Sequence, residues 1–295
     1  ILRVLPSGRL AAIHVTDRIL FGNVTGYGMP SVNPFHAKTI FHYMQHGFIF
    51  MGMITIETDV VRENNQTYRL GWTEQCKDGS KMGVGCPEYL LLFRKLPTDT
   101  SNAYADCPVT KYKEDYLWGK WQIDARGKWN SSGNSLLLPD DIKRLSVAQL
   151  SDQFAAFFKD TVYDYSMHVE IAERMERLDK LPATFETLRV PARTEYVWDD
   201  IVRMRTLNGQ QTQAREQNHI CPFQLDIVDR AITRWSNPDD IILDPFGGLM
   251  SVPYRAITLG RRGYGIELNT DYWKAGVGYC RAAEHKAKVP TRFDL

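Results

Sequence analysis

Membrane-spanning segments and charge imbalance are both missing from this 295-residue chain. No run of about 18 apolar residues occurs, which argues against a transmembrane helix. The opening residues ILRVLPSGRLAAIHV do not have the layout of a signal peptide. Thirty-six Lys and Arg residues oppose 35 Asp and Glu residues, giving a formal charge of +1. A surface that binds nucleic acid must therefore be local.

Cysteine is also scarce, with five residues that are odd in number and widely spaced. The absence of a C-x-x-C pair argues against a zinc site or a disulfide framework, and we expect no metal. Reduced thiols and a cytoplasmic location are the expectation. A zinc site formed by Cys76, Cys86 and a distant histidine remains open as the alternative, although zinc ligands are usually two to four residues apart.

Residues 1–96 read as one half of an α/β sheet. The pattern predicts the end of a helix at ILRVL and a buried strand at about residues 9–15. Residues 21–35, which hold three glycines and two prolines, are predicted to be loop. A helix ending at Gly47 and strands at 49–61 and 88–95 follow, the last of them running antiparallel.

Residues 97–217 have a different texture and are predicted to form an inserted, mostly helical domain. Three tryptophans are concentrated among basic residues in YLWGKWQIDARGKWNSSG. Tryptophans more often fill cores, so a helical domain with solvated charges is the alternative to a nucleic-acid contact. From residue 218 to 295 the α/β pattern resumes.

A glycine turn between two strands carries the strongest chemical signal. In ILDPFGGLMS an apolar strand runs into Asp244, and a helix is expected to start near Ser251. Glu267 lies at the end of the next strand, where a carboxylate can accept hydrogen bonds from both hydroxyls of a ribose. The turn lacks G-x-G-x-x-G, so a dinucleotide is not indicated. A nucleoside-containing cofactor is therefore expected.

The stretch LDPFGGLMSVPYRAITLGRRGYGIELNTDYW resembles the cofactor motif of amino-methylating DNA methyltransferases, D-P-F-x-G-x-G-[ST] followed by a helix and a strand ending in GiEl. HICPFQLDIVDRAITRW is similar to the element that precedes this motif, and RVLPSGRLAAIHV and EYLLLFRK resemble later strands. The resemblance implies a Rossmann-like sheet, mostly parallel with one antiparallel strand. It is split by a target-recognition domain in the order of the beta group, with boundaries at 1–96, 97–217 and 218–295.

The resemblance also implies S-adenosylmethionine as cofactor. The family's cofactor-binding positions fall on Asp244, Phe246, Gly248, Ser251, Glu267, His219, Pro222 and Phe223. Met250 departs from the pattern because it replaces the second glycine, and a side chain there narrows the backbone's approach to the ligand. We expect Met250→Gly to tighten cofactor binding or raise turnover.

The catalytic tetrapeptide [D/N/S]-P-P-[Y/F/W] does not occur in this sequence. The nearest string, NPFH at Asn33–His36, is assigned to loop, and the true motif is expected before residue 1. The chain is therefore predicted to be incomplete and unable to methylate DNA when it starts at Ile1. The strand at 9–15 is expected to lack a neighbour, and the fragment to fold poorly.

The resemblance implies a site-specific methyltransferase, of the type found in restriction–modification systems, that acts on a flipped base in double-stranded DNA. Adenine N6 is favoured over cytosine N4. The candidate DNA contacts are Arg62, Arg126, Lys128, Trp129, Arg189, Arg193 and Arg203. Two alternatives remain: a catalytically inactive DNA-binding or regulatory subunit, and an RNA or protein methyltransferase. A homodimer or partner subunit is left open, and no membrane partner is expected.

Overall fold

The computed structural model of the chain describes residues 1–58, 77–78, 80, 86–125, 144–150, 152, 165–181, 196–198, 201, 203, 205–207 and 223–288. The chain divides into two compact units, Ile1–Asp200 and Ile201–Leu295. In these ranges no helix is long and apolar enough to cross a membrane.

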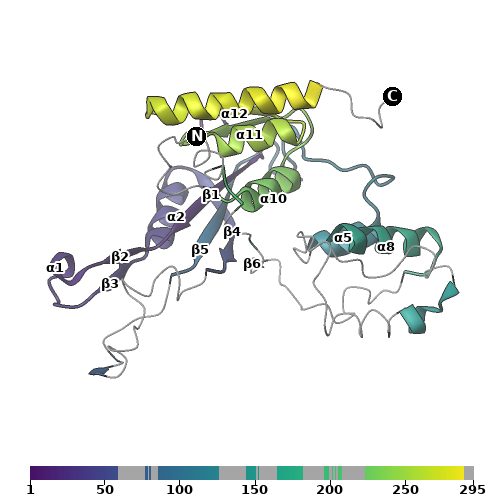
Figure 1. Ribbon diagram of the computed structural model, residues 1–295, viewed down its shortest axis with the longest axis horizontal. Coiled ribbons are helices and arrows are strands. Elements are labelled where there is room, and N and C mark those ends of the chain that lie inside the picture. The colour runs from purple at the N-terminus through teal and green to yellow at the C-terminus, as the bar shows by residue number, and fades with distance from the viewer. Residues whose placement is uncertain are drawn as a thin grey trace. The chain divides into compact units, whose positions relative to one another are not determined.

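The first unit is built on a sheet with the strand order β1-β5-β4-β6 (Figure 1). The strands are β1 (Leu10–Thr16), β4 (Phe48–Ile56), β5 (Glu88–Lys95) and β6 (Val197–Trp198). β5 runs antiparallel to both β1 and β4, and β6 pairs parallel with β4. The prediction that residues 9–15 lack a neighbour is wrong, because β5 pairs with β1 along its whole length and satisfies the backbone groups on that edge.

Helix α2 (Phe35–Gln45) covers one face of this sheet. Its Ile40 and Tyr43 pack against a buried cluster that includes Phe48 and Phe93. The Tyr43 and Phe93 rings stack with centroids 4.6 Å apart. The chain leaves the helix through Gly47, whose φ of 90° is the left-handed conformation that ends helices in this way. The expected helix end at Gly47 is thus confirmed.

The prediction that residues 21–35 are loop is wrong. These residues contain the one-turn helix α1 (Gly22–Thr25) and the strand β3 (Ser31–Asn33), which pairs antiparallel with β2 (Arg18–Leu20). The glycines and prolines lie at the turns of this hairpin instead of preventing it. The string Asn33–His36 is likewise not loop, because Asn33 ends β3 and Phe35 begins α2.

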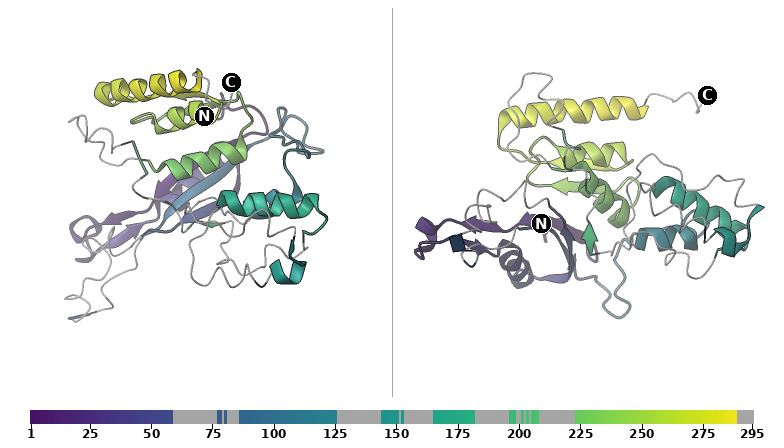
Figure 2. Two further views of the ribbon diagram at one scale, coloured as in Figure 1. Left: turned by 45° about the vertical axis from the view of Figure 1, so that its right-hand side comes forward. Right: turned by 60° about the horizontal axis from the view of Figure 1, so that its bottom comes forward.

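The second unit contains α10 (Leu225–Trp235), β7 (Ile241–Asp244), α11 (Ser251–Thr258), β8 (Arg262–Gly265) and α12 (Thr270–Lys288) (Figure 2). β7 and β8 pair in parallel, with Asp244 opposite Gly265. α11 crosses between them and packs closely on β8. A Cβ atom added at Gly263 would lie 2.5 Å from the Cα of Pro253, so only glycine fits there.

Helices α5 (Trp118–Ala125) and α8 (Tyr165–Arg177) fall within residues 97–217. They pack through Gly119, where an added Cβ would meet the Cβ of Ala172 at 2.9 Å. The Glu176 carboxylate accepts hydrogen bonds from the amides of Trp118 and Gly119 at 3.0 and 2.7 Å, so a side chain of α8 caps α5.

Candidate cofactor site

The turn after β7 is held by a ladder of backbone hydrogen bonds to the residues after β8. The Ile266 amide donates to the Asp244 carbonyl at 3.0 Å, and the Gly247 amide donates to the Ile266 carbonyl at 2.8 Å. Gly248 and Met250 both have left-handed φ angles, 53° and 60°. Helix α11 then begins at Ser251, as the sequence predicts.

The Glu267 side chain lies against this turn and is oriented by two backbone amides. Its Oε2 accepts from the Gly248 amide at 2.8 Å, and its Oε1 accepts from the Asn269 amide at 2.7 Å. Each carboxylate oxygen retains further acceptor capacity, because an ionised carboxylate offers about four lone-pair sites. The side chain of Asn269 caps α12 by accepting from the amides of Asp271 and Tyr272.

Asp244 forms a second carboxylate at the same edge of the two strands. Its Oδ1 accepts a hydrogen bond from the Phe246 amide at 3.0 Å. Burial raises the pKa of Asp244, the Phe246 amide opposes this shift, and the nearby Glu267 charge adds to it. Burial and Glu267 thus disfavour the ionised form of the Asp244 carboxyl, and a positively charged ligand would stabilise it.

The Met250 side chain is 4% exposed and fills a space bordered by three glycines. A Cβ added at Gly265 would lie 2.2 Å from the Met250 Sδ, and one added at Gly247 would lie 2.7 Å from the same atom. At Gly276, on α12, an added Cβ would lie 2.4 Å from the Met250 Cγ. Met250, at the position where the resemblance implies a second glycine, is thus accommodated by glycines on the turn, on β8 and on α12.

The other predicted cofactor residues differ in exposure. Phe246 is 85% exposed at the outer side of the turn, whereas Ser251 is buried. Phe223 packs against the apolar cluster formed by Val228, Ile232 and Ala256, which supports α10 and α11. His219 and Pro222 lie outside the described residues.

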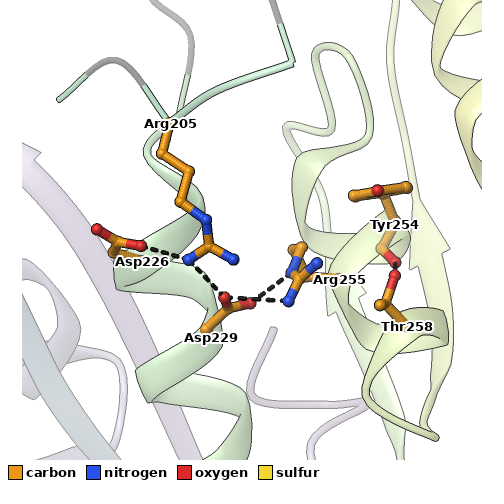
Figure 3. Close-up of polar contacts among 6 residues, drawn as sticks. All are labelled: Arg205, Asp226, Asp229, Tyr254, Arg255 and Thr258. Atoms are coloured by element: carbon orange, nitrogen blue, oxygen red, sulfur yellow. Dashed lines mark hydrogen bonds and ion pairs between the residues drawn. The ribbon is translucent and has the colours of Figure 1, made fainter. Parts of the chain in front are cut away.

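An ion-pair network connects α10, α11 and the chain that leads into them (Figure 3). Asp229 Oδ2 is 2.9 Å from Arg205 Nη1 and 3.1 Å from Arg255 Nη2. Arg205 also pairs with Asp226, which is buried at the start of α10. The Arg205 carbonyl accepts from the Leu225 amide at 2.9 Å. Arg205, one of the arginines in the predicted DNA-binding region, is therefore occupied by internal pairing.

Most of the predicted DNA contacts lie outside the described residues, namely Arg62, Arg126, Lys128, Trp129, Arg189 and Arg193. Arg203 is described, is half-buried and has an interaction partner. Trp118 and Trp121 do not fill a core: both are exposed, and their rings stack at 4.4 Å. The Nζ atoms of Lys111 and Lys120 lie 4.9 and 5.8 Å from the Tyr116 ring centroid.

Two features of the site were not found from the sequence. Asn269 was missed, although N-T-D after an apolar strand is a recognisable helix-capping signal. Gly276 was missed because nothing in its sequence neighbourhood connects it with Met250. Within the described ranges no three His, Cys, Asp or Glu side chains are placed to hold a metal ion. Cys76 lies outside those ranges, so the zinc alternative stays untested.

Comparison with known proteins gives a family match over most of the chain. A family model described as DNA methylase (N6_N4_Mtase) matches residues 3–277. A 104-residue stretch is 35% identical to DNA adenine methyltransferase YhdJ of Escherichia coli (strain K12). This stretch covers 35% of this chain and 32% of that protein, so the match spans about a third of the curated relative.

Among solved structures, the chain is similar to TTHA0409 of Thermus thermophilus, described as a DNA modification methylase and crystallised with S-adenosyl-L-methionine. The TM-score is 0.47 at 18% identity, covering 96% of this chain and 73% of that chain. Similarity to the M1.HpyAVI-SAM complex is lower, with a TM-score of 0.40 at 11% identity, covering 94% of this chain and 77% of that chain.

Proposed function

Because the chain belongs to the N6/N4 DNA methylase family, we propose that it transfers a methyl group from S-adenosylmethionine to an exocyclic amino nitrogen of double-stranded DNA. Adenine N6 is the proposed acceptor ahead of cytosine N4, since the relative from Escherichia coli is named as an adenine methyltransferase. The amino group of a stacked base is out of reach, so the target base must be flipped from the duplex.

The observation that carries the cofactor assignment is the hydrogen bond from the Gly248 amide to Glu267. In sites for phosphates or dinucleotides, the amides of such a turn are offered to an anion. Here a carboxylate already takes this amide, and Asp244 adds a second negative charge nearby. This arrangement favours a cationic ligand and disfavours a pyrophosphate. S-adenosylmethionine fits, because it joins a ribose to a sulfonium and an ammonium group.

The residues of the turn have separate proposed roles. Glu267, held by the Gly248 and Asn269 amides, would accept hydrogen bonds from the ribose hydroxyls. Asp244 would lie near the positive charge, and Phe246 offers an exposed apolar surface for the bound molecule to cover. When bound, the cofactor supplies an electrophilic methyl group, and the chain contributes orientation and exclusion of water.

Calorimetric titration of S-adenosylmethionine tests this assignment with Asp244→Ala and Glu267→Ala. Loss of a hydrogen-bonded charged group costs about 1.5–3 kcal/mol, which corresponds to a roughly 10- to 150-fold weaker Kd. Glu284→Ala is the matched control, because it removes an exposed acid of α12 without touching the turn. Unchanged affinity in both site variants, or tighter binding of ADP than of S-adenosylmethionine, would contradict the proposal.

We also propose that residues 97–217 form the target-recognition domain. The exposed Trp118–Trp121 pair supports this role, because solvent-facing aromatics beside lysines are suited to contact with DNA. Duplex affinity should fall linearly on a plot of log K against log salt. Each lysine whose phosphate contact is removed should reduce the slope by about 0.9. The same affinity at low and high salt would exclude a recognition surface that depends on basic residues.

Methyl transfer by the full-length protein is tested with unmethylated plasmid DNA and tritiated S-adenosylmethionine. Nucleoside mass spectrometry of the digested product then distinguishes N6-methyladenine from N4-methylcytosine. Cofactor and DNA binding without methylated product would instead identify a catalytically inactive subunit.

A further inference from the structure

The hairpin of residues 18–33 holds four large apolar side chains in solvent. Phe21, Val24, Tyr27 and Met29 are 52%, 66%, 76% and 45% exposed. They lie within nine residues of sequence at the tip, and the hairpin extends beyond the end of the four-stranded sheet in both figures (Figures 1 and 2). A compact group of exposed apolar side chains on one projection indicates a contact surface.

The tip is a defined structure. The chain turns out of α1 at Gly26, which has a φ of 74°. The Thr25 hydroxyl donates to the Met29 carbonyl at 2.9 Å and accepts from the Tyr27 amide at 3.2 Å. These bonds close the tip across the residues that carry the apolar side chains. Little conformational entropy would therefore be lost when the tip inserts into a partner.

The base of the hairpin is fixed to the body of the first unit. The Asp17 carboxylate lies 2.7 and 2.9 Å from the Nδ1 of His36, at the start of α2. Asp17 also accepts from the His36 backbone amide at 3.0 Å. The His36 ring lies 4.4 Å from the ring of Tyr89 on β5. These contacts hold the base of the hairpin in a fixed position relative to α2 and β5.

The charge of this segment suits a polyanion. From Arg18 to Ile56 the sequence contains no Asp or Glu, whereas it contains Arg18, Lys38 and three histidines. In a chain with a formal charge of only +1, this is a local run without negative charge. The acid that precedes this segment, Asp17, lies at the base of the hairpin and is hydrogen-bonded to His36. The apolar tip itself can therefore approach DNA with little repulsion from carboxylates of its own segment.

On the basis of the proposed function, we propose that the hairpin of residues 18–33 is a DNA wedge. Phe21 and Tyr27 would enter the base stack, with Val24 and Met29 covering the opened step. Apolar side chains inserted between base steps unstack and kink a duplex. Such insertion lowers the cost of extruding the target base, because the vacated stacking surface is covered. The wedge is distinct from the residues proposed to read the recognition sequence in 97–217.

The test uses the full-length protein with the double variant Phe21→Ser/Tyr27→Ser. Phe41→Ser on α2 is the matched control, since Phe41 is 64% exposed and belongs to the same acid-free segment but not to the hairpin. Duplex affinity is measured by fluorescence anisotropy with a short synthetic DNA duplex. Unwinding is measured by relaxing a closed circular plasmid with topoisomerase in the presence of each protein. A thermal melting curve of each variant checks that the whole chain is folded, and calorimetric titration with S-adenosylmethionine checks the second unit, which holds the proposed cofactor turn.

We expect the wild type and Phe41→Ser to shift the plasmid topoisomers. We expect the double variant not to shift them and to bind the duplex roughly tenfold or more weakly, with unchanged cofactor affinity. A double variant that binds and unwinds DNA like the wild type would overturn the wedge and leave the methyltransferase proposal intact. A wild type that binds cofactor but no duplex would overturn both. A wild-type dimer that becomes monomeric in the double variant, with duplex affinity retained, would overturn the wedge and assign the tip to a second copy of the chain.

Discussion

Replacing Met250 by glycine has two opposing effects on the stability of the turn that follows Asp244: it relieves backbone strain and it removes a buried side chain. Glycine would relieve the left-handed conformation of Met250, φ 60°, which costs a residue with a side chain about 1–2 kcal/mol. It would also remove a side chain that is 4% exposed. Truncating a buried methionine to alanine costs about 2–5 kcal/mol, including the cavity that remains. The packing term is larger, so we expect a net loss of stability of about 2 kcal/mol.

This expectation reverses the one drawn from the sequence, which held that glycine would improve the turn. The cavity would open under Gly247 and beside Gly276, both of which border the Met250 side chain. The Gly248 amide and Glu267 would lose their fixed geometry, and cofactor binding should weaken with stability. The melting temperature should fall by roughly 4–8 °C, since 1 kcal/mol corresponds to about 2–4 °C for a chain of this size.

Differential scanning fluorimetry of Met250→Gly and Met250→Ala measures both terms. The Met250→Ala variant loses the same buried side chain but keeps the strain of the left-handed backbone conformation. It should therefore be about 1–2 kcal/mol less stable than the Met250→Gly variant. Gly265→Ala adds a Cβ 2.2 Å from the Met250 Sδ and should be strongly destabilising. Combining it with Met250→Gly should restore part of the loss, because the closest contact is removed while the Pro253 Cγ contact at 2.9 Å stays. If Met250→Gly is as stable as the wild type and binds cofactor more tightly, the packing argument is refuted.

Three further outcomes are expected. Asp244→Asn should raise the melting temperature of the ligand-free protein above about pH 7 while weakening cofactor binding. The reason is that the pKa of Asp244 is raised, so the folded protein loses stability as the pH rises through that pKa and the buried carboxyl ionises. A variant that is less stable than the wild type at about pH 8 would contradict this. Burial, reinforced by Glu284, raises the pKa of Cys280 to about 11. Iodoacetamide at about pH 8 should therefore label the exposed Cys107 well before Cys280, as followed by peptide mapping. Equal labelling rates would show that the Cys280 thiol is accessible. Asp229→Ala should destabilise the second unit by about 3–5 kcal/mol, because the largely buried Arg255 loses its ion-pair partner. Denaturant unfolding measures this loss. A loss below about 1 kcal/mol would show that solvent replaces the ion pair between Asp229 and Arg255.

Local sequence was sufficient for the elements around the turn that follows Asp244. Asp244 ends a strand and a helix begins at Ser251, as the pattern predicts. Glu267, predicted at the end of the next strand, lies just beyond β8, which ends at Gly265. The reason is that the strand, turn and helix are specified by residues close to one another in the chain. Apolar runs and the glycines of the turn act over that range.

The hairpin at 18–33 shows where composition misled the prediction. Glycine and proline mark turns, but a short strand pair between turns depends on which backbone groups meet. Arg18 pairs with Asn33, and the Asp17–His36 contact that fixes the base spans 19 positions. The sequence around one residue of such a pair does not identify the other residue, because the stabilisation comes from the contact between them and not from the preference of either residue alone.

The sequence by itself determined the family, the strand–turn–helix at Asp244 and the position of the carboxylate at Glu267. Tertiary structure alone decided that the Gly248 amide is taken by Glu267, which favours a cationic ligand over an anion. It also decided that Met250 is accommodated, since the space it fills is bordered by Gly265 on β8 and Gly276 on α12. Whether a side chain fits depends on the volume left by residues that folding brings together, and no local pattern encodes that volume.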